Sequence, residues 1–209
     1  MRHLLRSVTC ALGALAVAEC AWAESQIDRM WARYADHVPE YCRYTQSLPD
    51  KATPGEHGHP LSTGKYRTLF GESWEAMHHY CYGLEEMFEA AQPGVEEIVQ
   101  RGLYETAIRN FDYVLLRMAD TIYLKPEIHV QKGLALLLLD RQADAVAAFT
   151  DAISLKNDYV PAYTALGAYF DGLGDLGQAA SILRQGLEHA PEDQDLRAQL
   201  LDLQSRGAR

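Results

Sequence analysis

The chain has 209 residues, with 29 acidic against 19 basic side chains and a formal net charge of −10. This balance argues against nucleic acid or an anionic membrane surface as a partner, because both repel an acidic protein. The acidic residues are scattered along the chain, which is typical of a solvated surface rather than of an acidic site.

The N-terminal segment, residues 1–23, has the pattern of an export signal. Arg2 and Arg6 give a basic start, residues 8–18 form a short apolar stretch, and residues 21–23 (Ala-Trp-Ala) form a small-x-small cleavage site. The apolar stretch is too short to span a bilayer comfortably. We therefore expect residues 1–23 to be a cleaved signal peptide.

Cleavage would leave a mature chain that begins near Glu24 and resides in the periplasm. The mature chain contains no other apolar run long enough to cross a membrane, so no transmembrane segment is predicted in it.

Export also determines how the cysteines are interpreted. Cys10 and Cys20 are lost with the signal, whereas Cys42 and Cys81 remain as a pair in an oxidising compartment. A disulfide between them would close a loop of about 40 residues and contribute roughly 3–4 kcal/mol in the chain-entropy model. The alternative is two buried free thiols.

The N-terminal part of the mature chain, residues 24–70, is predicted to be a divergent helical segment. Residues 24–47 have a helical pattern that is interrupted or bent at Pro39. Residues 48–65 are rich in Pro, Gly and His and are predicted to be a loop.

The next part, residues 71–121, is predicted to contain two helices. One spans residues 72–91 and the other residues 95–119, and the run Gln-Pro-Gly at residues 92–94 separates them.

Two segments of equal length then repeat without a gap, over residues 126–159 and 160–193. Small residues align with small ones and large with large, as in Gly133 with Gly167, Ala145 with Ala179, and Phe149 with Leu183. Small residues let two helices cross closely, and large ones fill the space between layers. Four helices are expected, near residues 126–139, 142–155, 160–172 and 176–189. A fixed period of this length indicates a solenoid of stacked helix pairs.

Residues 194–209 are predicted to form a capping helix and tail. Asp193 can cap this helix, which carries Leu196, Leu200 and Leu203 on one stripe. A terminal helix of this kind covers the core that an open solenoid end would expose.

The repeats resemble the tetratricopeptide repeat (TPR), whose signature is W-x2-L-G-x2-Y followed by Ala, Phe and Pro. The second unit matches it at Tyr163, Leu166, Gly167, Phe170, Ala179, Leu183 and Pro191. The first unit matches less well, because His129 and Lys132 replace the large apolar residues and Asn157 replaces the Pro.

Residues 71–121 resemble a degenerate further unit with an insertion. Trp74, Met77, His78 and Cys81 have the spacing of the first half of the signature, with His78 where Gly is usual. Residues 104–107 and Phe111 resemble the second helix of a unit.

The resemblance implies an all-α protein, a right-handed α-solenoid of TPR helix pairs. The divergent N-terminal part precedes it, two units fill residues 122–193, and the capping helix closes it. This pattern is similar to that of exported bacterial TPR-containing proteins.

In the TPR family the first helix of each unit lines the concave face of the solenoid, where partners bind. The residues of this chain at the inward positions are Val130, Leu134, Leu137, Thr164, Ala168 and Asp171. The Lys, Arg and Asn residues with which some TPR domains hold a C-terminal carboxylate are missing here. This mainly apolar groove suits an amphipathic helix or an extended hydrophobic segment of a partner. Equally, the chain's own N-terminal helix could fill it.

Two local motifs raise the question of an enzyme or metalloprotein. His78 and His79 are adjacent on a helix, so their side chains diverge by about 100° and cannot both face one metal comfortably. A packed helix interface explains them better. The run Gly172-x-Gly174-x-x-Gly177 spells a dinucleotide fingerprint, but it lies at a helix–helix turn with no preceding strand. No catalytic residue, metal or cofactor is predicted.

The sequence therefore predicts a non-enzymatic scaffold or adaptor for another protein of the cell envelope. The alternative is a protein that binds a small ligand or an envelope polymer through the aromatic-rich N-terminal half. Its aromatic residues are Trp31, Tyr34, Tyr41, Tyr44, Trp74, Tyr80 and Tyr82. Exposed rings in a cleft would favour the alternative, and buried rings would favour the scaffold.

Overall fold

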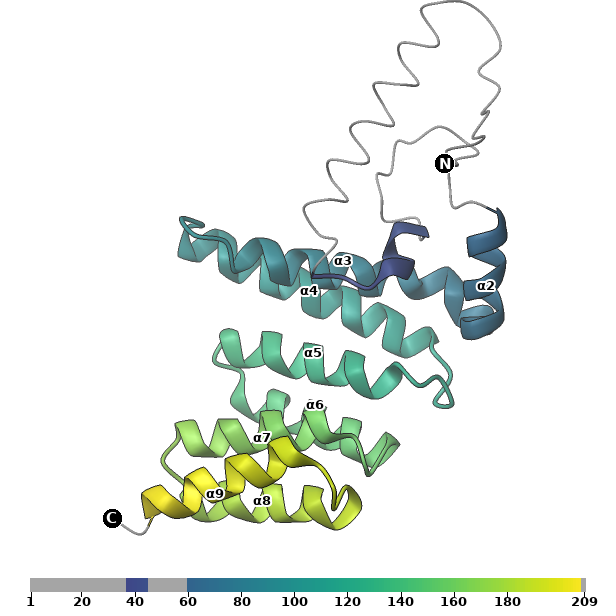
Figure 1. Cartoon of the computed structure of the whole chain (residues 1–209). Helices are drawn as coiled ribbons and strands as arrows, with labels where there is room; N and C mark the ends of the chain where they lie inside the picture. The colour runs from purple at the N-terminus through teal and green to yellow at the C-terminus, as the bar shows by residue number, and fades with distance from the viewer. Residues whose placement is uncertain (1–36, 45–59, 208–209) are drawn as a thin grey trace, which may run out of the picture.

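A computed structural model of the chain describes residues 37–44 and 60–207, which form a stack of helices (Figure 1). Within these residues there is no β-strand. The predicted signal peptide lies outside the described residues, as do Glu24, Trp31, Tyr34 and most of the predicted loop.

The helices pack in consecutive pairs, as expected for an α-solenoid. The elements are η1 (Glu40–Tyr44), α2 (Pro60–Phe70), η2 (Gly71–Ala76), α3 (Met77–Ala90), α4 (Glu97–Arg117), α5 (Lys125–Leu138), α6 (Gln142–Leu155), α7 (Val160–Gly172), α8 (Leu176–His189) and α9 (Gln194–Gly207). The most extensive contacts join α3 to α4, α5 to α6 and α7 to α8. These three hairpins lie one above the next along the stack (Figure 1). The all-α solenoid predicted from the sequence is confirmed.

The sequence period carries through to the last helix. Helix α7 begins at Val160 and α9 at Gln194, and the same interval separates the start of α6 at Gln142 from that of α8 at Leu176. Helix α9 thus stands where the first helix of a third unit would stand. Its start is fixed by Asp193, whose carboxylate accepts a hydrogen bond of 2.9 Å from the backbone N–H of Leu196.

Each hairpin is built on one close contact between a glycine and a large side chain of the facing helix. A Cβ added to Gly133 would overlap the ring of Phe149, and one added to Gly167 would lie 2.9 Å from Leu183. The hairpin of α3 and α4 repeats the contact, because a Cβ on Gly83 would overlap the Phe111 ring. The three hairpins therefore share one packing plan.

This contact corrects the register predicted for the degenerate unit. Gly83, rather than His78, occupies the small position against the second helix. The prediction for the second helix was closer, because Ala107 and Phe111 are fully buried in the core.

The turns inside the two periodic hairpins also match. Asp140 and Gly174 occupy equivalent positions of the two units, and both have positive φ, at 60° and 77°. Gly172 is the last residue of α7, Gly174 lies in the turn, and Gly177 is in the first turn of α8. These glycines therefore span a helix–helix connection.

The first helices of the units line the inner side of the stack. Helix α5 contacts α7, and α7 contacts α9, whereas the second helices α6 and α8 make no comparable contact in the described part of the chain. A stack whose first helices approach one another more closely than its second helices curves with the first helices on the concave side.

A disulfide and an aromatic core hold the N-terminal end together. Cys42 in η1 is bonded to Cys81 in α3, which confirms the predicted pairing. Around it, the rings of Tyr66, Phe70 and Trp74 stack with centroids 5.6 to 6.4 Å apart. Aromatic pairs at these separations add to the free energy gained by burial alone.

The loop predicted over residues 48–65 is wrong at its C-terminal end. Helix α2 already begins at Pro60. Proline is favoured in the first turn of a helix, because its missing N–H would have no intrahelical partner there.

None of the described helices is both long enough and apolar enough to cross a membrane.

Candidate partner-binding face

A hollow of about 400 Å³ opens between the first helices α7 and α9. Its lining includes the apolar side chains Ala168, Leu183, Ala198 and Leu203, together with the bare backbone of Gly167. The missing side chain at Gly167 makes room for Leu183 of α8, which packs against this backbone. Polar residues also line the hollow, and they are Thr164, Asp171, Gln199, Asp202 and Arg206.

Three charged residues of this lining form one ion cluster. Arg206 donates from Nη2 to Asp171 Oδ2 at 2.7 Å and from Nε to Asp202 Oδ2 at 2.9 Å. These two hydrogen bonds, the one to Asp171 above all, raise the pKa of Arg206. Asp171 Oδ1 is buried and accepts no hydrogen bond from the described part of the chain. The cluster carries one negative charge in excess, and it leaves an acceptor open for a donor from outside.

Three of the six predicted partner-binding residues meet at this hollow, namely Thr164, Ala168 and Asp171. Ala168 is exposed, and the other two are half-buried. The α9 residues that complete the lining were not predicted. Their signal was present in the sequence, because continuing the period by one further unit aligns Ala198 with Thr164 and Asp202 with Ala168.

The other three predicted residues belong to α5 and lie apart from the hollow. Val130 is only 5% exposed and packs in the core with Tyr104 and Ile108 of α4. Leu134 and Leu137 are half-buried against the same core. Val130 is therefore a packing residue in this chain.

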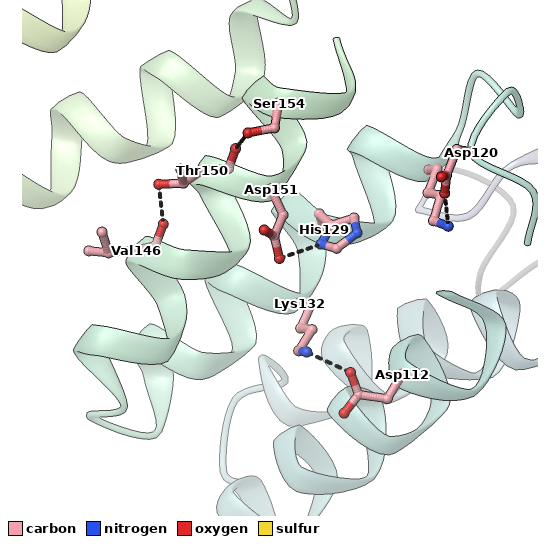
Figure 2. Close-up of polar contacts among 9 residues, drawn as sticks. Asp112, Asp120, His129, Lys132, Val146, Thr150, Asp151 and Ser154 are labelled. Carbon is pink, nitrogen blue, oxygen red and sulfur yellow. Dashed lines mark hydrogen bonds and ion pairs between the residues drawn. The ribbon is translucent and has the colours of Figure 1, made fainter. Parts of the chain in front are cut away.

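The polar residues that weaken the first unit's match form a seam across α4, α5 and α6 (Figure 2). Lys132 pairs with Asp112 of α4 at 2.6 Å, and His129 faces Asp151 of α6. At the corresponding positions, the second unit has Tyr163 and Leu166. An ion pair at Lys132 thus replaces the apolar packing that Leu166 makes in the second unit.

The Nδ1 atom of His129 makes no hydrogen bond within this seam. This atom lies 3.6 Å from Asp151 Oδ2, which is too far for a hydrogen bond. Burial lowers the pKa of His129, and the attraction of Asp151 opposes this effect only in part. The imidazole is therefore neutral at pH 7, and it acts as a packing group in the seam.

His79 is part of an interface between α3 and α4, as predicted, whereas His78 contacts His79 and Tyr82 of α3 itself. His79 Nδ1 lies 2.7 Å from Asn110 Oδ1, and the His79 ring lies 3.6 Å from the ring of Tyr113. Arg117 covers Tyr113 in turn. Among the described residues, no group of three His, Cys, Asp or Glu side chains could hold a metal ion.

Two adjacent glutamates of α3, Glu85 and Glu86, are half-buried. Burial raises the pKa of Glu85 to about 7, with a further contribution from the neighbouring charge of Glu86. Burial raises the pKa of Glu86 to about 7 as well, although Arg109 opposes it. Each has one buried oxygen without a hydrogen-bond partner in the described part of the chain.

Comparison with known proteins supports TPR-like helical repeats. No protein-family model matches the chain. A stretch of 116 residues, 54% of the chain, is 31% identical to an Hsp70-Hsp90 organizing protein of Triticum aestivum. The chain spans only about a fifth of the length of that relative.

Proposed function

We propose that this protein is a non-enzymatic scaffold or adaptor that binds another protein of the cell envelope through the concave face of its solenoid. The hollow between α7 and α9 is the observation that carries the proposal. It combines apolar surface, which gains free energy on burial, with polar groups that can fix the orientation of a partner segment.

The chemistry of the hollow favours a particular kind of partner segment. The excess negative charge around Arg206 and the open acceptor on Asp171 favour a segment that brings a small apolar side chain next to a donor. A partner's C-terminal carboxylate would be repelled by Asp171 and Asp202.

The relative's name describes a protein that organises Hsp70 and Hsp90. Similarity to a protein that brings others together supports a general role in protein–protein interaction. Because the shared stretch is a fifth of that relative, we carry over this general role and not its partners.

The envelope location rests on the export pattern of residues 1–23 and on the pairing of Cys42 with Cys81. Structural disulfides persist in oxidising compartments and are rare in reducing ones. We therefore propose a periplasmic protein whose signal peptide is cleaved before Glu24.

The alternative function, binding of a small ligand or an envelope polymer on the faces of the N-terminal aromatic rings, has less support. Such binding needs exposed ring faces, but Tyr41, Trp74 and Tyr80 are all buried in the N-terminal core. By the criterion set out from the sequence, these buried rings favour the scaffold.

Affinity capture from the source cells tests the proposed function. Ala168→Asp places a third carboxylate in the lining, next to Asp171 and Asp202, and should remove the captured partner. Ala147→Asp is the matched control, because Ala147 is also exposed and lies on the second helix α6. We expect wild type and Ala147→Asp to capture the same protein and Ala168→Asp to lose it, at unchanged helical content by circular dichroism. Equal capture by all three chains would contradict the proposal.

A further inference from the structure

We propose that the junction between the N-terminal core and helix α5 is a binding site for a primary ammonium group, with the carboxylate of Glu127 as its counter-ion. The site is separate from the α7–α9 hollow, and it is independent of the proposed scaffold function. Its centre is the hydrogen bond from the Tyr80 hydroxyl group to Glu127, and Tyr41, Tyr123 and Tyr159 lie near enough to Glu127 to be affected by its charge.

Glu127 lies in the first turn of α5 and is half-buried. Its Oε1 accepts a hydrogen bond of 2.6 Å from the hydroxyl group of Tyr80, which is itself fully buried. No described Lys, Arg or His lies within ion-pair distance of this carboxylate. The nearby ammonium group of Lys125 is engaged with Asp120 and with the backbone carbonyl of Met118. A half-buried carboxylate without a cation is an unbalanced charge.

Tyr41 supplies a second group that lacks a partner. The residue is only 8% exposed, and its hydroxyl group has no hydrogen-bond partner among the described residues. The ring is held edge-on against Phe70 and Tyr66, with centroids 5.2 and 5.8 Å apart. The hydroxyl group therefore stays buried, and leaving it unpaired weakens the fold unless a ligand supplies the missing partner.

The hydroxyl groups of all four tyrosines lie within electrostatic range of Glu127. Burial is the first cause that raises the pKa of Tyr41 and of Tyr123, and the Glu127 charge is the second. Burial, with a further contribution from Glu127, also raises the pKa of Tyr159 to about 12. The Glu127 charge also raises the pKa of Tyr80, after burial and Tyr41. Tyr123 is 55% exposed and Tyr159 half-buried, so the cluster runs from the surface to the buried oxygens of Tyr41 and Tyr80.

A primary ammonium group matches this set of oxygens. It offers three N–H donors on one compact charge, and the cluster offers one carboxylate together with phenol oxygens that can accept. A guanidinium group fits less well, because it prefers both carboxylate oxygens at once and Tyr80 already occupies one. A divalent metal ion would need more anionic ligands than the single carboxylate supplies.

Isothermal titration calorimetry of the full mature chain with n-butylammonium tests the site. We expect saturable binding with one equivalent. Glu127→Gln should weaken it at least tenfold, because the amide keeps the shape but loses the charge. Tyr41→Phe, which removes only the hydroxyl oxygen, should weaken it severalfold. Glu105→Gln on the exposed face of α4 should bind like wild type.

One comparison needs no variant and so remains decisive even if Glu127→Gln fails to fold. Neutral 1-butanol has the same alkyl chain, and it should bind the wild-type protein at least tenfold more weakly than n-butylammonium. Equal binding of the two compounds, no binding of n-butylammonium, or unchanged binding by Glu127→Gln would each overturn the proposal.

The ammonium group could belong to a small amine or to a lysine side chain. A capped Ala-Lys-Ala peptide and its acetyl-lysine form distinguish these sources. Binding of the lysine peptide but not of the acetylated one supports a lysine ligand, and binding of n-butylammonium alone supports a small amine. Equal binding of both peptides would contradict recognition of the charge.

Discussion

The two ends of this solenoid are stabilised in different ways. Residues 125–207 are held by contacts that recur once in each repeat, between helices that are neighbours in sequence, such as Gly133 with Phe149. The N-terminal end is held by a disulfide, stacked rings and a hydrogen bond from Tyr80 to Glu127, which joins groups 47 residues apart. A periodic stack distributes its stability over many similar interfaces, whereas the N-terminal end depends on a few contacts that the repeat does not supply.

The largest effect is expected at the disulfide. Replacing both Cys42 and Cys81 by Ser should lower the free energy of unfolding of the N-terminal end by about 4 kcal/mol in the chain-entropy model. The periodic helices α6 to α8 make no contact with this bond, so they should be affected much less. Hydrogen exchange measured by mass spectrometry separates the two ends. Equal loss of protection in both would show that the solenoid unfolds as one unit.

A somewhat smaller effect is expected within the periodic part. Gly133→Leu forces a branched side chain against the Phe149 ring and should cost about 3 kcal/mol, because overpacking displaces the helices. Gly102→Ala is the control, since a Cβ at that exposed helical position would meet open space. It should stabilise the chain by about 0.5–1 kcal/mol. Similar denaturation midpoints for the two variants would contradict the packing plan.

The packing plan also shows what could be predicted from the sequence. The period places Gly133 and Gly167 correctly, because Gly133 precedes Phe149 by the same interval as Gly167 precedes Leu183. Gly83 and Phe111 are further apart in sequence than Gly133 and Phe149, because the hairpin of α3 and α4 is longer. The fixed repeat period therefore did not predict their contact. Pro60 resembled a loop residue because proline favours both loops and first helical turns.

The candidate sites were predictable only where the period reaches them. Thr164, Ala168 and Asp171 follow from their repeat positions. The burial of Val130 does not, because it involves residues of α4, which lies outside the two periodic units. The tyrosines near Glu127 come from η1, α3, the turn before α5 and the start of α7. No local pattern links residues so far apart in sequence.

Charge burial in the N-terminal end predicts a pH dependence. The pKa of Glu85 is raised to about 7, above its ordinary value of 4.5, so the folded state binds a proton more tightly than the unfolded state. Stability should then fall as the pH rises from about 4.5 to about 7. Glu85→Gln should remove this loss and stabilise the chain by on the order of 2 kcal/mol at pH 8. It should have little effect at pH 4, and urea denaturation at the two pH values measures both. A larger gain at pH 4 would reverse the expected sign.

The smallest expected effect concerns the turns of the periodic part. Asp140 has positive φ where the second unit has Gly174, and glycine adopts this conformation without strain. Asp140→Gly should therefore stabilise the chain by about 0.5 kcal/mol, and Gly174→Ala should destabilise it by about 1 kcal/mol. Thermal denaturation of the two variants checks both signs, and a destabilised Asp140→Gly would contradict the shared turn geometry.

Site-specific photo-crosslinking tests most directly whether the concave face of the periodic part contacts a partner. A photoreactive phenylalanine analogue is placed at position 168 in the α7–α9 hollow or, as a control, at the exposed position 147 of α6. The full chain is then irradiated in its source cells. The account predicts a discrete crosslinked protein from position 168 and none from position 147. A crosslink from position 147 alone would place the partner on the opposite side of the solenoid and contradict the account.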